Sequence, residues 1–135
     1  MEYGAENIEA EIKLWRLLNQ QQWDDLKKIF CEEFEYFCPQ TEEKMNLDEF
    51  IAVNKSFNGV RNFENINSFH EYNQWEHRSN IVSVFYVESQ QPEMPKQIFY
   101  KISFVIVDDG KIVEMTEYNA ETMHVPSWMK NRQLK

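Results

Sequence analysis

The sequence predicts an α+β fold in which three helices come first and a mostly antiparallel sheet follows. In the first half of the chain, apolar residues recur at spacings of three and four, which is the period of amphipathic helices. From Phe63 onward the period changes to two, and turn residues separate the apolar segments. Helices followed by hairpin-connected strands favour helices packed on one face of the sheet. No change of composition marks a boundary, so we expect a single domain over residues 1–135.

Three segments account for the helical period. The first spans about Glu6 to Gln20, and its apolar stripe includes Ile8 and Ile12. The second runs from Trp23 to Phe30 and has acids in its first turn, where the helix dipole favours them. The third begins at Asn46, because an Asn followed three residues later by a Glu is a capping box.

Five segments have the composition of strands. The first, Phe34–Cys38, is short, rich in aromatic residues and followed by a proline. The other four are longer and follow one another as hairpins, at about Asn65–Trp75, Ile81–Glu88, Gln97–Val107 and Lys111–Glu121.

The turn between the last two strands sets their pairing. We expect Asp108-Asp109-Gly110 to form a three-residue loop with the glycine in the left-handed region. This loop places one face of the two strands in register, with Val105 opposite Val113, Ser103 opposite Met115, Lys101 opposite Glu117 and Phe99 opposite Asn119.

The other face of the same two strands is also apolar. A sheet with one face in water would instead show a polar face. One face must therefore cover the helices, and for the other a second copy of the chain is the simplest partner. We predict a homodimer through this outer sheet face, whose even-numbered residues include Ile98, Tyr100, Ile102, Phe104, Ile106 and Ile112.

The composition argues against two classes of partner. The chain has 23 acidic residues against 14 Lys and Arg, a net charge of -9, which would repel phosphate backbones and anionic lipids. We expect neither nucleic acid nor a membrane as a partner. No segment resembles a bilayer span or a signal peptide, so we expect a cytoplasmic protein. Cys31 and Cys38 match neither a disulfide framework nor a zinc spacing, and both are expected to be reduced.

Two motifs, in the order of elements described above, carry a family resemblance. They are W-D-D-L-K-K-I-F from Trp23 to Phe30 and D-G-K-I-V-E-M-T-E-Y from Asp109 to Tyr118. Over nearly its whole length the chain resembles the nuclear-transport-factor-2-like superfamily, which includes ketosteroid-isomerase-like and SnoaL-like proteins. The resemblance implies a cone, in which a strongly curved sheet wraps round the helices, with a pocket at the wide end and frequent dimers. The odd-numbered face of the last two strands would line that pocket.

The resemblance does not extend to the isomerase machinery. The isomerases place a tyrosine, a base aspartate and a neutral acid at positions that here hold Leu14, Cys38 and Ser103. Steroid isomerisation needs a carboxylate and oxyanion donors, so we reject this activity. Cyclase-like relatives often carry acids near the end of the last strand, where Glu117 matches and Ala120 does not.

Glu117 and Lys101 are the candidate catalytic residues. In an apolar pocket Glu117 is either a base whose charge Lys101 holds or an anchor for a polar substrate group, and the alternative is an ordinary ion pair at the rim. The other predicted ligand-binding residues are Cys38, Ser103, Met115, Asn119, Trp15, Phe99, Trp75 and His70.

Several of these residues also have a purely structural interpretation. A lone thiol such as Cys38 is more often a small buried residue than a nucleophile, and His70 is either an acid or base or a hydrogen-bonded structural histidine. His77 and His124 are expected in a loop and in the tail, and no metal or cofactor is predicted, because no cluster of ligands surrounds any histidine. Trp128, which follows Pro126, would close an edge or pack on a partner subunit.

The sequence therefore predicts a homodimeric cone-fold protein that binds a small, mainly apolar molecule, since a few polar groups in apolar walls are typical of such sites. Whether it is also an enzyme of the isomerase, cyclase, dehydratase or hydrolase type is left open. The alternative is a non-catalytic interaction module whose pocket is filled by its own side chains.

Overall fold

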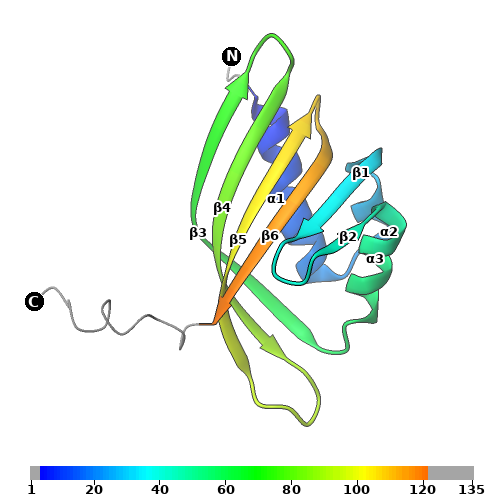
Figure 1. Ribbon diagram of the computed structural model, residues 1–135, viewed down its shortest axis with the longest axis vertical. Coiled ribbons are helices and arrows are strands. Elements are labelled where there is room, and N and C mark those ends of the chain that lie inside the picture. The colour runs from blue at the N-terminus through cyan, green and yellow to red at the C-terminus, as the bar shows by residue number, and fades with distance from the viewer. Residues whose placement is uncertain (1–3, 122–135) are drawn as a thin grey trace, which may run out of the picture.

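The computed structural model describes residues 4–121 and confirms the α+β class (Figure 1). The helices lie in the first half of the chain and the long strands in the second. In chain order the elements are α1 (Ala5–Gln20), α2 (Trp23–Lys27), β1 (Phe30–Cys38), β2 (Glu43–Met45), α3 (Leu47–Ser56), β3 (Val60–Asn73), β4 (Arg78–Gln90), β5 (Gln97–Asp108) and β6 (Lys111–Glu121).

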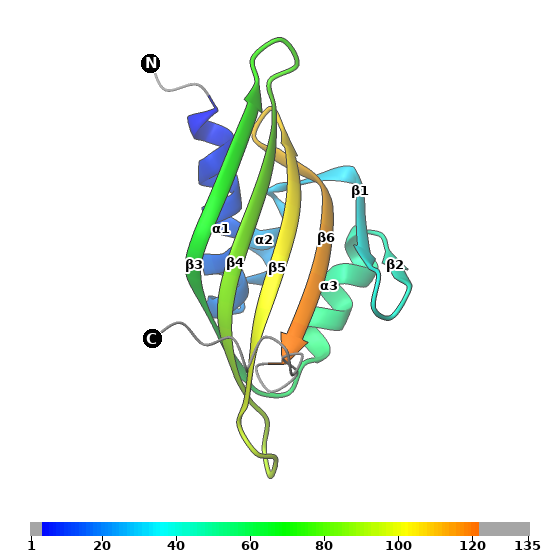
Figure 2. The same ribbon diagram turned by 60° about the vertical axis from the view of Figure 1, so that its left-hand side comes forward.

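The strands form one curved sheet of mixed direction that does not close. Its order is β2-β1-β6-β5-β4-β3, in which β1 and β6 are parallel and all other neighbours are antiparallel. The helix α1 packs along one face of the four long strands, and α3 packs against β1 and β2 (Figures 1 and 2). The concave face of the sheet is therefore the face that covers the helices.

The helix α1 forms where it was predicted, but the buried face of its first half differs from the predicted stripe. Ile8 and Ile12, predicted on the buried side, are 36% and 56% exposed. Asn7 and Glu11 are buried instead. In the second half of the helix the apolar residues are buried as the period predicts, namely Leu14, Trp15, Leu17 and Leu18. Hydrophobicity alone does not fix the rotation of this helix, because the two polar side chains find hydrogen-bond partners inside the protein.

The helix α3 begins with the predicted capping box. The Glu49 backbone N–H donates to Asn46 Oδ1 at 2.9 Å, and the Asn46 backbone N–H donates to Glu49 Oε1 at 3.1 Å. Two N–H groups that the helix leaves without partners are satisfied in this way.

Pairing with β6 changes the boundary between α2 and β1. The predicted helix continued to Phe30, but α2 ends at Lys27, and Phe30 pairs with Ile112 at the start of β1. The Ile112 N–H also donates to the Ile29 carbonyl oxygen at 2.9 Å. Contacts with a strand distant in sequence therefore override the local helical period. The short strand β2 was not predicted, because three residues are too few to show a period.

The β5–β6 turn differs from the predicted loop. Asp109 and Gly110 have φ values of 48° and 79°, as a two-residue hairpin turn with two left-handed residues requires. A register shift follows between Ile106 and Val107. The predicted pairing is therefore wrong by two residues, and the observed partners are Val105 with Met115, Ser103 with Glu117, Lys101 with Asn119 and Phe99 with Glu121. Because the side-chain period of a strand is two, these residues keep their predicted face.

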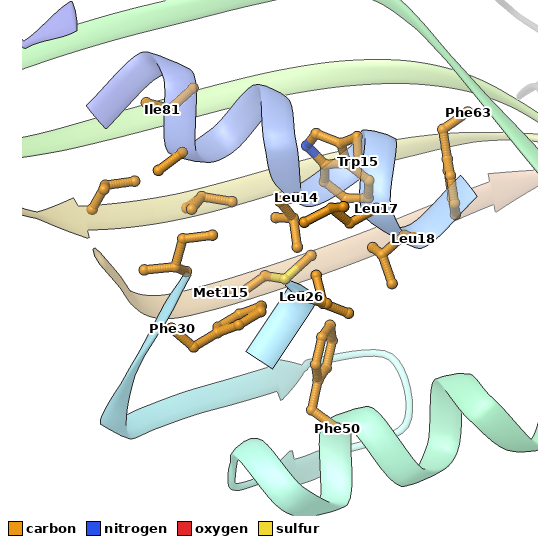
Figure 3. Close-up of a cluster of buried hydrophobic side chains, with 14 of the residues drawn as sticks. Leu14, Trp15, Leu17, Leu18, Leu26, Phe30, Phe50, Phe63, Ile81 and Met115 are labelled. Carbon is orange, nitrogen blue, oxygen red and sulfur yellow. The ribbon is translucent and has the colours of Figure 1, made fainter. Parts of the chain in front are cut away.

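The core lies between the helices and the concave face. Figure 3 shows side chains from α1, Phe50 of α3 and Met115 of β6 pointing into one cluster. The register shift brings Ile112, predicted on the outer face, fully inside. Aromatic rings fill the part of the core near β3 and β4, where the Trp15 centroid lies 5.3 Å from Phe63 and 4.3 Å from Phe85.

The convex face is apolar, as predicted. Exposed fractions of 37% to 43% are found for Ile98, Tyr100, Ile102, Phe104 and Tyr118. None of the helices within residues 4–121 has the length and apolar character needed to cross a bilayer. The predictions for His124, Pro126 and Trp128 fall outside the described residues.

Candidate functional site

Four of the predicted site residues form a compact polar patch on the concave face, which we call the inner patch. It consists of Lys101 and Ser103 on β5 and Glu117 and Asn119 on β6. Ser103 lies opposite Glu117, and Lys101 lies opposite Asn119. Lys101, Ser103 and Glu117 are at most 9% exposed. The patch therefore places two charges and two neutral polar groups inside the protein.

Lys101 and Glu117 form an ion pair between diagonal neighbours of the ladder. The pair is buried rather than at a rim, because the two side chains are 11% and 6% exposed. The Lys101 Nζ also lies 5.6 Å from the centroid of the Phe63 ring. Burial lowers the pKa of Lys101 and the charge of Arg61 adds to this effect, while Cys38 opposes it. Burial alone therefore favours the neutral amine of Lys101, whereas a carboxylate partner such as Glu117 favours its charged form.

Two polar atoms of the inner patch have no hydrogen-bond partner among residues 4–121. They are Ser103 Oγ and Asn119 Oδ1, and both are inaccessible to solvent. The backbone of Asn119 is nevertheless fixed, because Gln40 Nε2 donates to its carbonyl oxygen at 2.5 Å and its N–H donates to Gln40 Oε1 at 2.6 Å. Buried polar groups normally have partners, so these two atoms are the unusual feature of the patch.

Cys38 and Met115 adjoin the inner patch. Cys38 ends β1 and is buried as a free thiol, and Met115 is buried opposite Tyr36 and Val105. Burial raises the pKa of the Tyr36 phenol, so this group stays neutral. Phe99 is half-buried and packs against the core.

Trp75, predicted as a wall of the pocket, does not belong to this group. It lies in the turn between β3 and β4 and is 86% exposed. The Trp75 N–H donates to Asn73 Oδ1 at 3.0 Å, which stabilises the turn. The strand β3 ends at Asn73, two residues before the predicted end at Trp75.

Trp15 and His70 line a separate groove between α1 and strands β3 and β4. Its volume is about 690 Å³. His70 Nε2 shares a hydrogen bond of 2.7 Å with Ser79 Oγ, and burial lowers the pKa of the imidazole. The other lining residues are Ile8, Glu11, Ile12, Arg16, Asn19, Gln20, Phe63, Asn65, Ser68, Ile81 and Phe85.

Glu11, which the sequence analysis missed, is a buried acid in the wall of this groove. It is 4% exposed, and its Oε1 accepts hydrogen bonds of 2.8 Å from Trp15 Nε1 and from Ser83 Oγ. Burial raises the pKa of the carboxyl group, although the two hydrogen bonds oppose this. The spacing of four residues between Glu11 and Trp15 is a signal that could have indicated the contact.

A second groove, of about 650 Å³, lies where β1, β2 and α3 meet β6. Its walls include Glu35, Glu49, Glu114 and Lys44. Within residues 4–121, no three His, Cys, Asp or Glu side chains converge as a metal site.

Comparison with known proteins finds similarity in structure only. No protein-family model matches the sequence, and no curated protein matches it. An NTF-2 like protein of unknown function from Burkholderia xenovorans is 17% identical, with a TM-score of 0.72 over 98% of this chain and 97% of that one. A candidate ketosteroid isomerase from Kribbella flavida is 16% identical, with a TM-score of 0.71 over 93% and 86% of the two chains. An LEH-like epoxide hydrolase from M. tuberculosis is 11% identical, with a TM-score of 0.69 over 84% and 82%.

These structures share the arrangement of helices and curved sheet described above, at identities that establish similarity of fold alone. The chain therefore has the nuclear-transport-factor-2-like cone fold, with a sheet that does not close.

Proposed function

We propose that this protein binds a small, mainly apolar molecule at the inner patch. The observation that carries the proposal is the pair of buried, unpartnered atoms, Ser103 Oγ and Asn119 Oδ1, beside the Lys101–Glu117 ion pair. A ligand with one or two polar groups would supply the missing hydrogen bonds, and its apolar part would contact the neighbouring Phe63, Phe99 and Met115. Few polar groups within apolar walls are typical of small-molecule sites.

The proposal extends to catalysis of the SnoaL-like type. The isomerase and hydrolase activities named for two similar structures support it, because the same fold carries them. In this chain Glu117 is the one carboxylate of the inner patch. It would act as the proton acceptor toward a bound substrate, with Lys101 as its ion-pair partner. Ser103, opposite Glu117, would orient the substrate.

A second candidate function is a non-catalytic interaction module. One observation favours it: the concave face is occupied by side chains of the chain itself, including Leu14, Trp15, Phe85 and Met115, each at most 6% exposed. In that case Lys101 and Glu117 satisfy one another and no ligand enters.

We further propose that the protein works as a homodimer through the convex face of the sheet. The support is the row of exposed Ile98, Tyr100, Ile102 and Phe104 on β5, next to Tyr118 on β6. Apolar patches of this kind are rare on surfaces that stay in water. The two free cysteines support a reducing compartment such as the cytoplasm, and the net charge of -9 argues against nucleic acid or a membrane as the partner.

Native mass spectrometry of freshly purified protein tests the binding proposal. We expect an added mass that is released on denaturation and absent from the Lys101→Met/Glu117→Leu double variant, which replaces the charges by side chains of similar volume. Asn80→Ala, an exposed change on the convex face, should keep the mass. If wild type carries no added mass, and a diverse set of small apolar compounds leaves its melting temperature unchanged, the interaction module is correct instead.

A further inference from the structure

The groove between α1 and strands β3 and β4 contains a buried acid without an ion-pair partner, which the inner patch does not explain. Among residues 4–121, Glu11 is the only acid that lines this groove, and neither Lys101 nor Glu117 lines it. None of the ion pairs within residues 4–121 includes Glu11. A carboxyl group that is 4% exposed therefore forms no ion pair with a described residue. Buried acids are usually paired, so the missing ion-pair partner of Glu11 is unusual.

The hydrogen bonds of Glu11 leave one oxygen available. Trp15 Nε1 and Ser83 Oγ both donate to Oε1, at 2.8 Å each. The other oxygen, Oε2, has no hydrogen-bond partner among residues 4–121. Because Trp15 and Ser83 fix the position of the carboxyl group, Oε2 is a pre-positioned acceptor in the groove wall. Burial without a counter-charge also raises the pKa of Glu11, and a bound cation would remove that cost.

The walls around Glu11 fit an organic cation rather than a metal ion. The rings of Trp15, Phe63 and Phe85 lie within 6.3 Å of one another, centroid to centroid, and all three line the groove. Aromatic faces attract ammonium groups, and they also accommodate apolar carbon. The volume of about 690 Å³ is ample for a small molecule, and the net charge of -9 attracts cations.

We propose that this groove binds a small apolar amine in its ammonium form. The nitrogen donates to Glu11 Oε2, and the hydrocarbon part packs on Trp15, Phe63 and Phe85. Arg16 also lines the groove, and its like charge directs the ammonium group toward Glu11. This is a second site, additional to the inner patch, and it requires neither Lys101 nor Glu117.

The test uses benzylamine and benzyl alcohol, which have similar shapes and differ in charge. Binding is followed by NMR through the indole N–H of Trp15, because this group donates directly to Glu11. We expect benzylamine to shift the Trp15 signal and to bind at least about tenfold more tightly than benzyl alcohol, as a charged hydrogen bond implies. The Lys101→Met/Glu117→Leu variant should bind benzylamine like wild type, which separates this site from the inner patch.

Glu11→Gln is the decisive variant, because its side-chain oxygen still accepts from Trp15 and Ser83 while the charge is lost. We expect benzylamine to bind this variant at least about tenfold more weakly. Glu6→Gln makes the same change of net charge at an exposed position of the same helix and should bind like wild type. Three results would each overturn the proposal: equal binding of the two probes, unweakened binding of benzylamine to Glu11→Gln, or a Trp15 signal that does not respond.

Discussion

The backbone N–H of Gly110 donates a hydrogen bond of 2.7 Å to Asn7 Oδ1. The Asn7 amide group in turn donates to the His77 carbonyl oxygen at 3.1 Å and to Ser79 Oγ at 3.0 Å. Asn7 is fully buried, so no water competes for these bonds. One side chain of α1 thereby holds both the β3–β4 turn and the β5–β6 turn, and it fixes how the helix lies on the sheet.

Asn7→Ala should lower the free energy of unfolding by about 2 to 4 kcal/mol, because it leaves the buried Gly110 N–H and the groups at His77 and Ser79 without their partner. Urea unfolding measures this difference. The control is Asn80→Ala, an exposed position on β4, where we expect a change within about 0.5 kcal/mol. Equal stability of the two variants would show that Asn7 does not hold the two turns.

Breaking the buried ion pair should cost more than removing it entirely. Lys101→Met leaves the Glu117 charge buried and alone, so we expect a loss of about 3 to 5 kcal/mol of unfolding free energy. The Lys101→Met/Glu117→Leu double variant should recover most of this loss, because no unpaired charge remains. Thermal and urea unfolding of both variants measure the difference.

The matched control for this pair lies on the surface. Lys96 contacts Glu88 at 2.9 Å with both side chains well exposed, so Lys96→Met should cost at most about 1 kcal/mol. If the double variant is as unstable as Lys101→Met, the charges of the inner patch contribute net stability and the prediction is wrong.

The elements that the sequence predicted well depend on neighbours within a few residues. The capping box at Asn46 and Glu49 is complete within four residues. The strand Lys111–Glu121 begins directly after a turn and ends where the alternation of apolar and polar residues ends, so both of its bounds are local features. The faces of β5 and of β6 beyond the register shift were also predicted correctly, whereas Ile112, next to the turn, was not. The predicted loop was one residue too long, and the register shift beyond the turn raised the pairing error to two residues, which preserves the face there.

What the sequence could not predict depends on residues far apart in the chain. Glu11 reads as a solvated acid on a helix, and its burial follows from Ser83, 72 residues away. The start of β1 at Phe30 likewise depends on Ile112. The sequence pattern places Trp75 at the end of a strand, whereas the hydrogen bond from its N–H to Asn73 Oδ1 belongs to a turn.

The dimer proposal predicts that a charge on the convex face is disruptive. Phe104 lies near the middle of β5 and is 43% exposed, and its ring centroid is 6.1 Å from that of Tyr118. Phe104→Glu should convert a dimer to a monomer, because a buried unpaired carboxylate at an interface is unfavourable. Light scattering with size-exclusion chromatography measures the mass.

Val53→Glu provides the control for this experiment. Val53 is 49% exposed on α3, which packs against β1 and β2 rather than on the convex face. The variant should keep the oligomeric state of wild type. A monomeric wild type, or a Phe104→Glu protein that is still dimeric, would exclude this face as the interface.

Glu11 should make stability depend on pH in the direction opposite to that of most acids. Its folded-state pKa is raised above the ordinary value of 4.5 by burial, so between these two values the folded state binds more protons than the unfolded state. Its stabilising contribution is fully present below pH 4.5 and is lost as the pH rises through the folded-state pKa. Glu11→Gln keeps both hydrogen bonds and cannot ionise.

The free energy of unfolding of Glu11→Gln should therefore match that of wild type near pH 4 and exceed it at pH 8. Urea unfolding at several pH values measures this difference. Arg16 and His70 line the same groove and are present in both proteins, so the difference reports the Glu11 charge and its interaction with these two side chains. If wild type instead gains stability relative to Glu11→Gln as the pH rises, the folded protein stabilises the Glu11 carboxylate. The groove would then already contain a counter-charge, and the ammonium site would lose its physical basis.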